Sequence, residues 1–159
     1  MMNKRRNNFN ILSPSKDQVQ RVSNFLDGLG KYINTQGPIA YKRMVFQITI
    51  DIMSIDKLKN VSLNKNLLTD IFHMASFDYK NCAEEFAIDL TDSMFFIERI
   101  KLNKGRNLYE IFFKNQSKLV LEDIARCTLI LDELADEKLG KYEGWKIKRI
   151  GNHDWRNYI

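Results

Sequence analysis

The sequence predicts an α+β fold in which two helices cover one face of a four-stranded sheet, preceded by an extra helix and strand. Three observations predict it. The 159 residues are enough for one domain with a substantial core. With 44% hydrophobic residues and two prolines, the composition is that of a folded protein. Residues 70–150 alternate between short β-prone runs and runs with helical periodicity, in the order β, α, β, β, α, β.

Residues 1–65 are predicted to form an amino-terminal extension that packs on the core. Ser13 is a typical N-cap residue and Pro14 a typical first helical residue, and apolar residues recur after them at helical spacing. This pattern predicts a helix over about 14–33, which ends before the turn formers of TQGP.

A strand is predicted over about 41–52, because apolar and polar residues alternate there with a period of two. The apolar members of this alternation are Met44, Phe46, Ile48, Ile50 and Ile52. We expect these side chains to lie on one buried face of the strand.

The core domain is predicted over 66–151, with a basic tail at 152–159. Its first two elements are a strand at IFHMASF and a helix at KNCAEEFAIDLTD. The inward face of this helix is expected to hold Ala83, Phe86, Ala87 and Leu90. A hairpin follows, in which the turn formers of NKGR join MFFIERIKL to NLYEIFF.

The second core helix is predicted at LEDIARCTLILDELADEKLG, where Gly140 stops it, and WKIKRI is the last strand. The inward residues of this helix are expected to be Leu121, Ile124, Ala125, Thr128, Leu131 and Ala135. The complete order, βαββαβ, is the ferredoxin-like split βαβ arrangement.

The second face of this sheet also needs a cover. Two strands carry neighbouring phenylalanines, Phe95 with Phe96 and Phe112 with Phe113, so they are apolar on both sides. We expect residues 13–52 to supply the cover. The alternative is a second copy of the chain in a homodimer.

The charge of the chain is unevenly distributed. The formal net charge is +5, but it divides into +7 over residues 1–69, −5 over 70–140 and +3 over 141–159. A surface that binds nucleic acid would run across the main domain rather than stop at its edges. This distribution therefore argues against a nucleic-acid interface across the core.

Several chemistries lack their motifs in this sequence. No apolar run approaches the roughly 20 residues of a membrane span, and the amino terminus lacks a signal-peptide core, so we expect an intracellular, cytoplasmic protein. Cys82 and Cys127 are isolated and predicted to be reduced. His73 and His153 are far apart, and His73 is expected to be a hydrogen-bonded core or edge residue. No catalytic residue, metal or cofactor is predicted.

KGRNLYEIFF shares its basic residue and glycine with a strand of the RNA recognition motif, which is also a βαββαβ fold. Lys104 and Gly105 fit that pattern. The residues that do not fit it are Arg106, Asn107, Leu108, Tyr109 and Ile111, so an aromatic stacking platform is not expected from this motif.

The outward faces of the two core helices are acidic and carry single apolar residues. The candidates for contact with a partner are Glu84 and Ile88 on the first helix and Glu122, Arg126, Leu129, Glu133, Asp136 and Glu137 on the second. An apolar residue among acids suits a partner with a basic, partly apolar site, such as the RNA groove of a nuclease. The alternative interpretation is two ordinary solvated helix faces.

The helix LDELADEKLG, leading into KYEGW, resembles the RraB family of small bacterial regulators of ribonuclease E activity. The resemblance covers about residues 70–150. Tyr142, Glu143, Gly144 and Trp145 match the Tyr-acid-Gly-Trp motif of that family, with Glu where Asp is usual. We interpret the motif as a structural corner in which Trp145 packs under the preceding helix.

The resemblance implies a non-enzymatic protein that binds a large ribonuclease and alters its activity. We expect the chain to be a monomer or, if a second copy covers the sheet, a homodimer. The same fold would suit an immunity protein that neutralises a nuclease toxin. The remaining alternative is a direct RNA binder that uses its basic termini, MMNKRRNNFN and KIKRIGNHDWRNYI. Trp155 and Tyr158 would then stack on bases.

Overall fold

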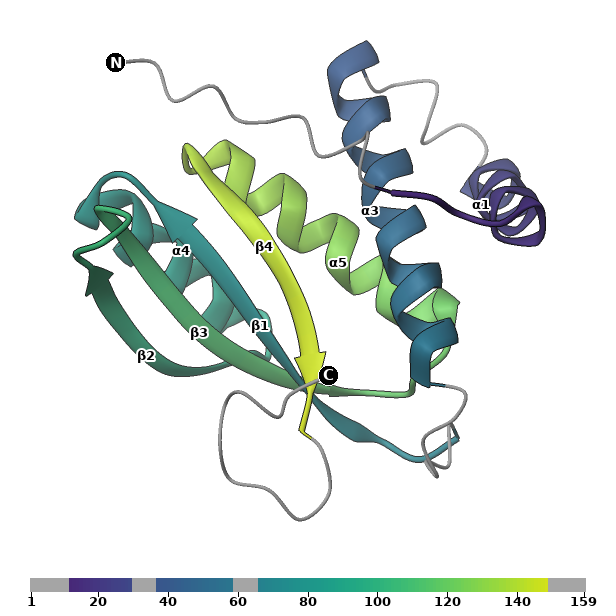
Figure 1. Cartoon of the computed structure of the whole chain (residues 1–159). Helices are drawn as coiled ribbons and strands as arrows, with labels where there is room; N and C mark the ends of the chain where they lie inside the picture. Colours follow the sequence, from purple (N-terminus) through teal and green to yellow (C-terminus); the bar gives the residue numbers. More distant parts are fainter. Residues whose placement is uncertain (1–11, 30–36, 59–65, 149–159) are drawn as a thin grey trace. The chain divides into compact units, whose positions relative to one another are not determined.

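A computed structural model describes residues 12–29, 37–58 and 66–148 of the chain (Figure 1). The chain divides into two compact units, residues 1–62 and 63–159. The first unit holds helices α1 (Lys16–Leu29) and α3 (Pro38–Lys57). The second unit holds the elements β1, α4, β2, β3, α5 and β4, in that order.

In the first unit, α1 begins two residues later than the sequence predicted. Ser15 is the residue that caps it, because the Ser15 hydroxyl accepts a hydrogen bond from the Gln18 amide at 3.1 Å and Gln18 Oε1 accepts one from the Ser15 amide at 2.9 Å. Helix α1 contacts α3, and Arg21 Nη1 of α1 lies 2.8 Å from Asp56 Oδ2 of α3.

The strand predicted over about 41–52 is wrong, because these residues form the middle of α3. Met44, Ile48 and Ile52 are spaced by four residues, so they fit one face of a helix as well as a period of two. Ile55 continues this buried face by one more turn. Pro38 stands in the first turn of the helix, where its missing amide hydrogen costs nothing.

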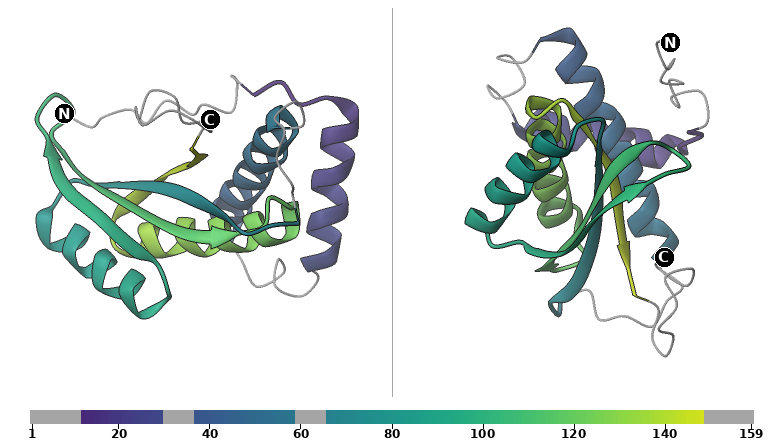
Figure 2. Two further views of the ribbon diagram at one scale, coloured as in Figure 1. Left: turned by 90° about the horizontal axis from the view of Figure 1, so that it is seen from below. Right: turned by 90° about the vertical axis from the view of Figure 1, so that its left-hand side faces the viewer.

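In the second unit, the strands form a single sheet in the order β2-β3-β1-β4, and every neighbouring pair is antiparallel. This order and the βαββαβ sequence of elements confirm the ferredoxin-like fold. The strands are β1 (Thr69–Phe77), β2 (Phe96–Asn103), β3 (Leu108–Ser117) and β4 (Gly140–Ile147). Helices α4 (Lys80–Asp92) and α5 (Leu121–Glu137) lie on the same face of the sheet (Figure 2).

The core of this unit lies between the sheet and the two helices. Ala83, Phe86, Ala87 and Leu90 of α4 are buried as predicted. The buried residues of α5 are Ile124, Ala125, Thr128, Leu131 and Ala135, and Leu121 is half-buried. The strands supply Ala75, Phe77, Ile111, Phe113 and Tyr142. Full burial of such large apolar side chains stabilises the fold by roughly 1.5–3 kcal/mol each.

The sequence suggested that Gly140 ends α5, and this prediction is wrong. The helix ends at Glu137, Lys138 caps it, and Leu139 adopts the left-handed conformation with φ of 59°. Gly140 is instead the first residue of β4, where a Cβ would overlap the Phe77 ring. The last strand therefore starts five residues before the predicted WKIKRI.

Candidate functional site

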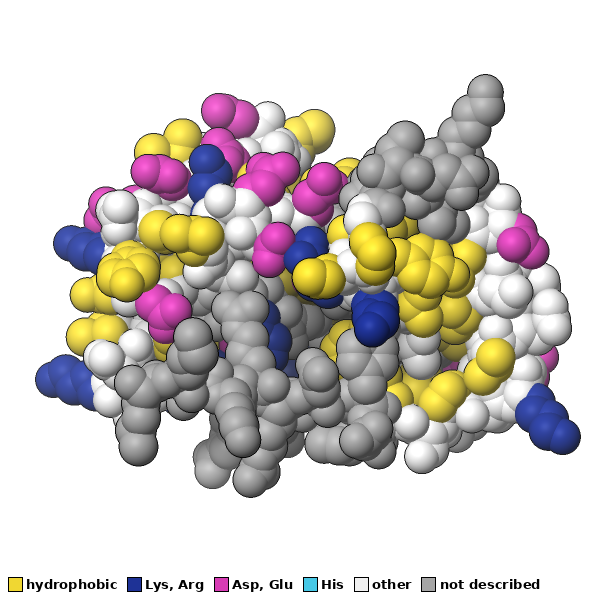
Figure 3. Space-filling model, turned by 90° about the horizontal axis from the view of Figure 1, so that it is seen from above, with side chains coloured by type: hydrophobic (Ala, Val, Ile, Leu, Met, Phe, Trp, Pro, Cys, Tyr) yellow, Lys and Arg dark blue, Asp and Glu magenta, His cyan; other side chains and the backbone are white. Residues whose placement is uncertain are grey.

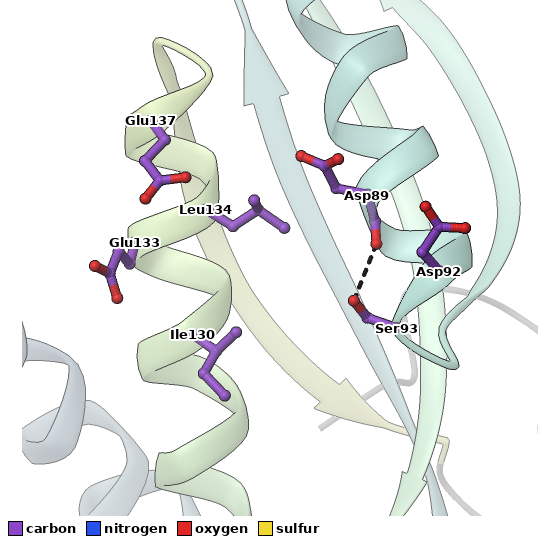
Figure 4. A pocket seen from close by; sticks show the side chains of 7 residues that line it. All are labelled: Asp89, Asp92, Ser93, Ile130, Glu133, Leu134 and Glu137. Atoms are coloured by element: carbon purple, nitrogen blue, oxygen red, sulfur yellow. Dashed lines mark hydrogen bonds between the residues drawn. The ribbon is translucent and has the colours of Figure 1, made fainter.

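Helices α4 and α5 enclose an open groove of about 380 Å³ on the outer side of the second unit. Asp89, Asp92 and Ser93 line it from α4 and the residue after it; Ile130, Glu133, Leu134 and Glu137 line it from α5 (Figure 4). We call this set of seven residues the acidic groove. Leu134 points across the groove towards α4, and Ile130 stands one turn before it on the same helix.

Small buried side chains lie on the inner faces of both helices. Ala83 and Ala87 of α4 and Ala125 and Ala135 of α5 are buried against the strands. Leu134 is half-buried against the same core, which leaves its edge at the floor of the groove. The groove thus has an apolar floor under a polar rim.

Acidic side chains dominate both helices. Together α4 and α5 contain ten acidic and two basic residues, which makes this layer strongly negative. Lys138 offsets part of the charge, because its Nζ lies 3.5 Å from Asp89 Oδ2 and 3.7 Å from Glu85 Oε2. These ion pairs are exposed, so each is worth less than about 1 kcal/mol. Figure 3 shows acidic side chains gathered beside exposed apolar ones at the upper left.

The structure brings only part of the predicted contact set together. Glu133 and Glu137 line the groove, whereas Glu122, Arg126 and Asp136 are exposed on α5 without lining it. On α4, Glu84 and Ile88 are exposed, and Ile88 keeps 62% of its surface.

Leu129 was predicted to be the outward apolar residue of α5, but it is not the most exposed apolar residue of this helix. Leu129 is half-buried, and its neighbour Ile130 is 61% exposed and lines the groove. The prediction also left out Asp89, Asp92 and Leu134. Only the packing of α4 beside α5 shows which residues of the two helices face each other. The sequence alone could have placed four of the groove residues on one side of α5, because their spacing is helical: Ile130, Glu133, Leu134 and Glu137.

The motif Tyr142 to Trp145 is not the corner that the sequence suggested, because it lies within β4 at a β-bulge. Met74 pairs with Gly144 and Ala75 pairs with Tyr142, so Glu143 is the extra residue of the bulge. Gly144 has φ of 123°, which a residue with a side chain rarely adopts. Trp145 is half-buried and pairs with His73 of β1.

Glu143 joins three parts of the sheet. Its Oε1 accepts hydrogen bonds from Ser76 Oγ at 2.6 Å and from Arg106 Nη2 at 2.8 Å, and Arg106 also pairs with the buried Glu110 at 3.3 Å. Burial raises the pKa of Glu143, but these hydrogen bonds and the charges of Lys141 and Arg106 outweigh it and hold the pKa below its usual value. The hydrogen bond to Glu143 raises the pKa of Arg106.

His73 is a buried member of the core, as predicted. Its ring stacks on Phe113, with centroids 5.2 Å apart, and both ring nitrogens have hydrogen-bond partners, Tyr142 and Asn115. Within residues 12–29, 37–58 and 66–148, no three His, Cys, Asp or Glu side chains are grouped to hold a metal ion, and no helix is long and apolar enough to cross a membrane.

Residues 50–147 match the model of a protein family described as RraB, regulator of ribonuclease activity B. The chain belongs to the RraB family. The RraB match begins inside α3, about twenty residues before the predicted resemblance, and ends at the last residue of β4. It therefore contains the acidic groove and the bulge motif. A comparison with curated proteins gives no match.

Lys146 and Lys148 of the predicted RNA-binding termini are described and exposed, whereas residues 1–10 and 149–159, with Trp155 and Tyr158, lie outside the described residues. The RraB match, residues 50–147, includes neither residues 1–10 nor residues 149–159. The proposed cover of the second sheet face by residues 13–52 stays a prediction.

Proposed function

We propose that this RraB-family protein regulates a ribonuclease by binding it directly, without catalysis of its own, and that the acidic groove is the contact surface. The observation that carries the proposal is the combination of four carboxylates and two apolar side chains in one groove. Family membership supports the ribonuclease as the target.

Charge complementarity supports this choice of partner. A ribonuclease binds RNA through basic side chains placed along the phosphate backbone. The carboxylates of Asp89, Asp92, Glu133 and Glu137 offer such a surface negative charge in place of phosphate. When the acidic groove of this chain binds the basic surface of the ribonuclease, the opposite charges attract and the bound chain blocks RNA from that surface.

The exposed isoleucines add affinity that charge alone does not supply. Ile88 and Ile130 each keep about three fifths of their surface exposed in the free protein. Complete burial of an isoleucine against a partner is worth roughly 1.5–3 kcal/mol, whereas charges at an interface rim mainly accelerate association. We therefore expect Ile130 to be the anchor and the surrounding carboxylates to select a basic partner.

An endogenous ribonuclease is the first candidate for the partner, because the family is described by regulation of ribonuclease activity. Neutralisation of a nuclease toxin is the second candidate, since an acidic groove would complement the basic active site of a toxin as well. Assays with the two kinds of nuclease distinguish the candidates.

Cleavage of a short labelled RNA by purified ribonuclease E tests the proposal. The wild-type chain is expected to change the cleavage rate, and Glu133→Lys with Glu137→Lys is expected to abolish the effect. The matched control is Asp78→Lys with Glu98→Lys, which makes the same charge change at exposed residues outside the groove. Equal activity of the two double variants would refute the groove as the contact surface.

A further inference from the structure

The two layers of the second unit carry opposite charge. Helices α4 and α5 have ten acidic and two basic residues, whereas the four strands and the hairpin turn 104–107 have seven basic and four acidic ones. The overall charge of residues 70–140 conceals this difference, because the acidic helices outweigh the basic strands. The strands are therefore a separate surface to consider.

The strand register places aromatic and basic side chains alternately on the face opposite the helices. His73, Phe113 and Tyr142 face the helices, so their neighbours in the strands face away from them. Residues that pair directly share a face. One row across the sheet is Phe96, Lys114, Phe72 and Lys146, and the next row is Arg99, Phe112, Met74 and Gly144.

The cations of this face lie over the rings. Arg99 Cζ is 4.4 Å and Lys101 Nζ is 5.5 Å from the centroid of Phe112, and Lys114 Nζ is 5.8 Å from the centroid of Phe72. These distances are within the range of cation–π attraction. Arg99 and Lys101 are exposed and have no acidic partner within the described parts of the chain. Lys114 differs from them, because its Nζ lies 3.6 Å from Asp70 Oδ2.

The rings have different roles. Phe72 and Phe112 are buried beneath the cations, so their rings are not available to stack on a base. Phe96 is 72% exposed at the outer strand of the sheet, beside Lys114. An exposed ring next to cations has the properties of a stacking site for a nucleobase.

We propose that this sheet face binds single-stranded RNA, with phosphates on Arg99 and Lys101 and one base stacked on Phe96. The cations supply the attraction for the backbone, and the ring supplies stacking that any base satisfies. This site goes beyond the proposed contact with a ribonuclease, because it lies on the strands and the acidic groove lies on the helices. It replaces the cover predicted for this face from residues 13–52, since a covered face could not bind RNA. Its test is independent of any nuclease.

Fluorescence anisotropy of a labelled 12-nucleotide single-stranded RNA, titrated with the full chain at 50 and 200 mM salt, tests the proposal. Arg99→Ala with Lys101→Ala is expected to weaken binding at least tenfold at 50 mM salt. The same change should lower the slope of log affinity against log salt by about 1.4, because each phosphate contact to a single strand contributes about 0.7.

Two further variants separate stacking and nonspecific charge. Phe96→Leu should weaken binding about fivefold or more and leave the salt slope unchanged, since stacking of one base is worth about 1–3 kcal/mol. Lys80→Ala with Lys118→Ala removes two exposed cations elsewhere in the same unit and should leave affinity within twofold.

Three results would overturn the proposal. The first is a wild-type chain that does not bind the RNA at 50 mM salt. The second is equal affinity of the Arg99 and Lys101 variant and the Lys80 and Lys118 control, which would place RNA binding elsewhere on the chain. The third is displacement of the labelled RNA by poly-glutamate as efficiently as by unlabelled RNA. That result would mean that the sheet face binds acidic protein segments instead of RNA.

Discussion

The hydroxyl of Tyr142 lies 2.7 Å from Nδ1 of His73 in the core of the second unit. His73 Nε2 lies 2.8 Å from Asn115 Oδ1, which only accepts, so Nε2 carries the hydrogen and Nδ1 accepts from Tyr142. Burial lowers the pKa of His73 to about 4, although its hydrogen bond to Asn115 acts in the opposite direction. The neutral ring is thus part of the packed core.

The stability of the protein should fall in weak acid because of His73. Between pH 6.5 and about 4 the unfolded chain binds a proton at this histidine that the folded chain does not, so the free energy of unfolding falls as pH falls. The expected loss by pH 4.5 is on the order of 2–3 kcal/mol. Urea unfolding at pH 7.0, 5.5 and 4.5 measures it. His73→Gln removes the titration, and an unchanged pH dependence in that variant would show that other groups cause it.

Arg106 should stabilise the bulge of β4 through Glu143. In Arg106→Met, the buried Glu110 and the largely buried Glu143 lose their shared cation. Because Arg106 itself is partly exposed, we expect a loss of only about 1–3 kcal/mol in the free energy of unfolding. Lys104→Met in the same turn is the control and should cost less than about 0.5 kcal/mol. Equal losses in the two variants would mean that the network contributes nothing specific.

Gly140 should tolerate no side chain. In Gly140→Ala the new methyl group would overlap the Phe77 ring and lie 2.8 Å from the carbonyl oxygen of Ser76, so either the ring or the strand must shift. We expect a loss of about 1–3 kcal/mol or more, as for other overpacked cores. Gly28→Ala in α1 meets nothing within 4 Å and should be neutral or stabilising. Thermal unfolding compares the two, and a neutral Gly140→Ala would contradict the packing described for β4.

Periodicity was sufficient to predict most of the second unit. The inward residues of α4 and α5 repeat at 3.6-residue spacing, which a strand cannot satisfy, so both helices and their buried faces are confirmed. The apolar residues from Met44 to Ile52 fit a strand and a helix equally well. They recur at every second position, and this series includes the four-residue spacing that lies on one face of a helix. The proline of α3 was the better signal, since it occupies the first turn of the helix.

The site was less accessible from sequence. In LILDEL three apolar residues crowd one turn, so a small rotation of α5 decides whether Leu129 or Ile130 is exposed. The hydrogen bonds of His73 and Glu143 join residues 69 and 37 positions apart, and only the strand register sets them. The alternation of rings and cations on the sheet face depends on the same register.

Affinity for ribonuclease E, measured by calorimetry at physiological salt, tests the central claim most directly. The comparison uses the wild-type chain, Glu133→Lys with Glu137→Lys, and the control Asp78→Lys with Glu98→Lys. We predict that the groove variant binds at least tenfold more weakly, a loss of about 1.4 kcal/mol or more, while the control stays within twofold of wild type. A groove variant that binds as tightly as wild type would contradict the assignment of the acidic groove as the ribonuclease contact.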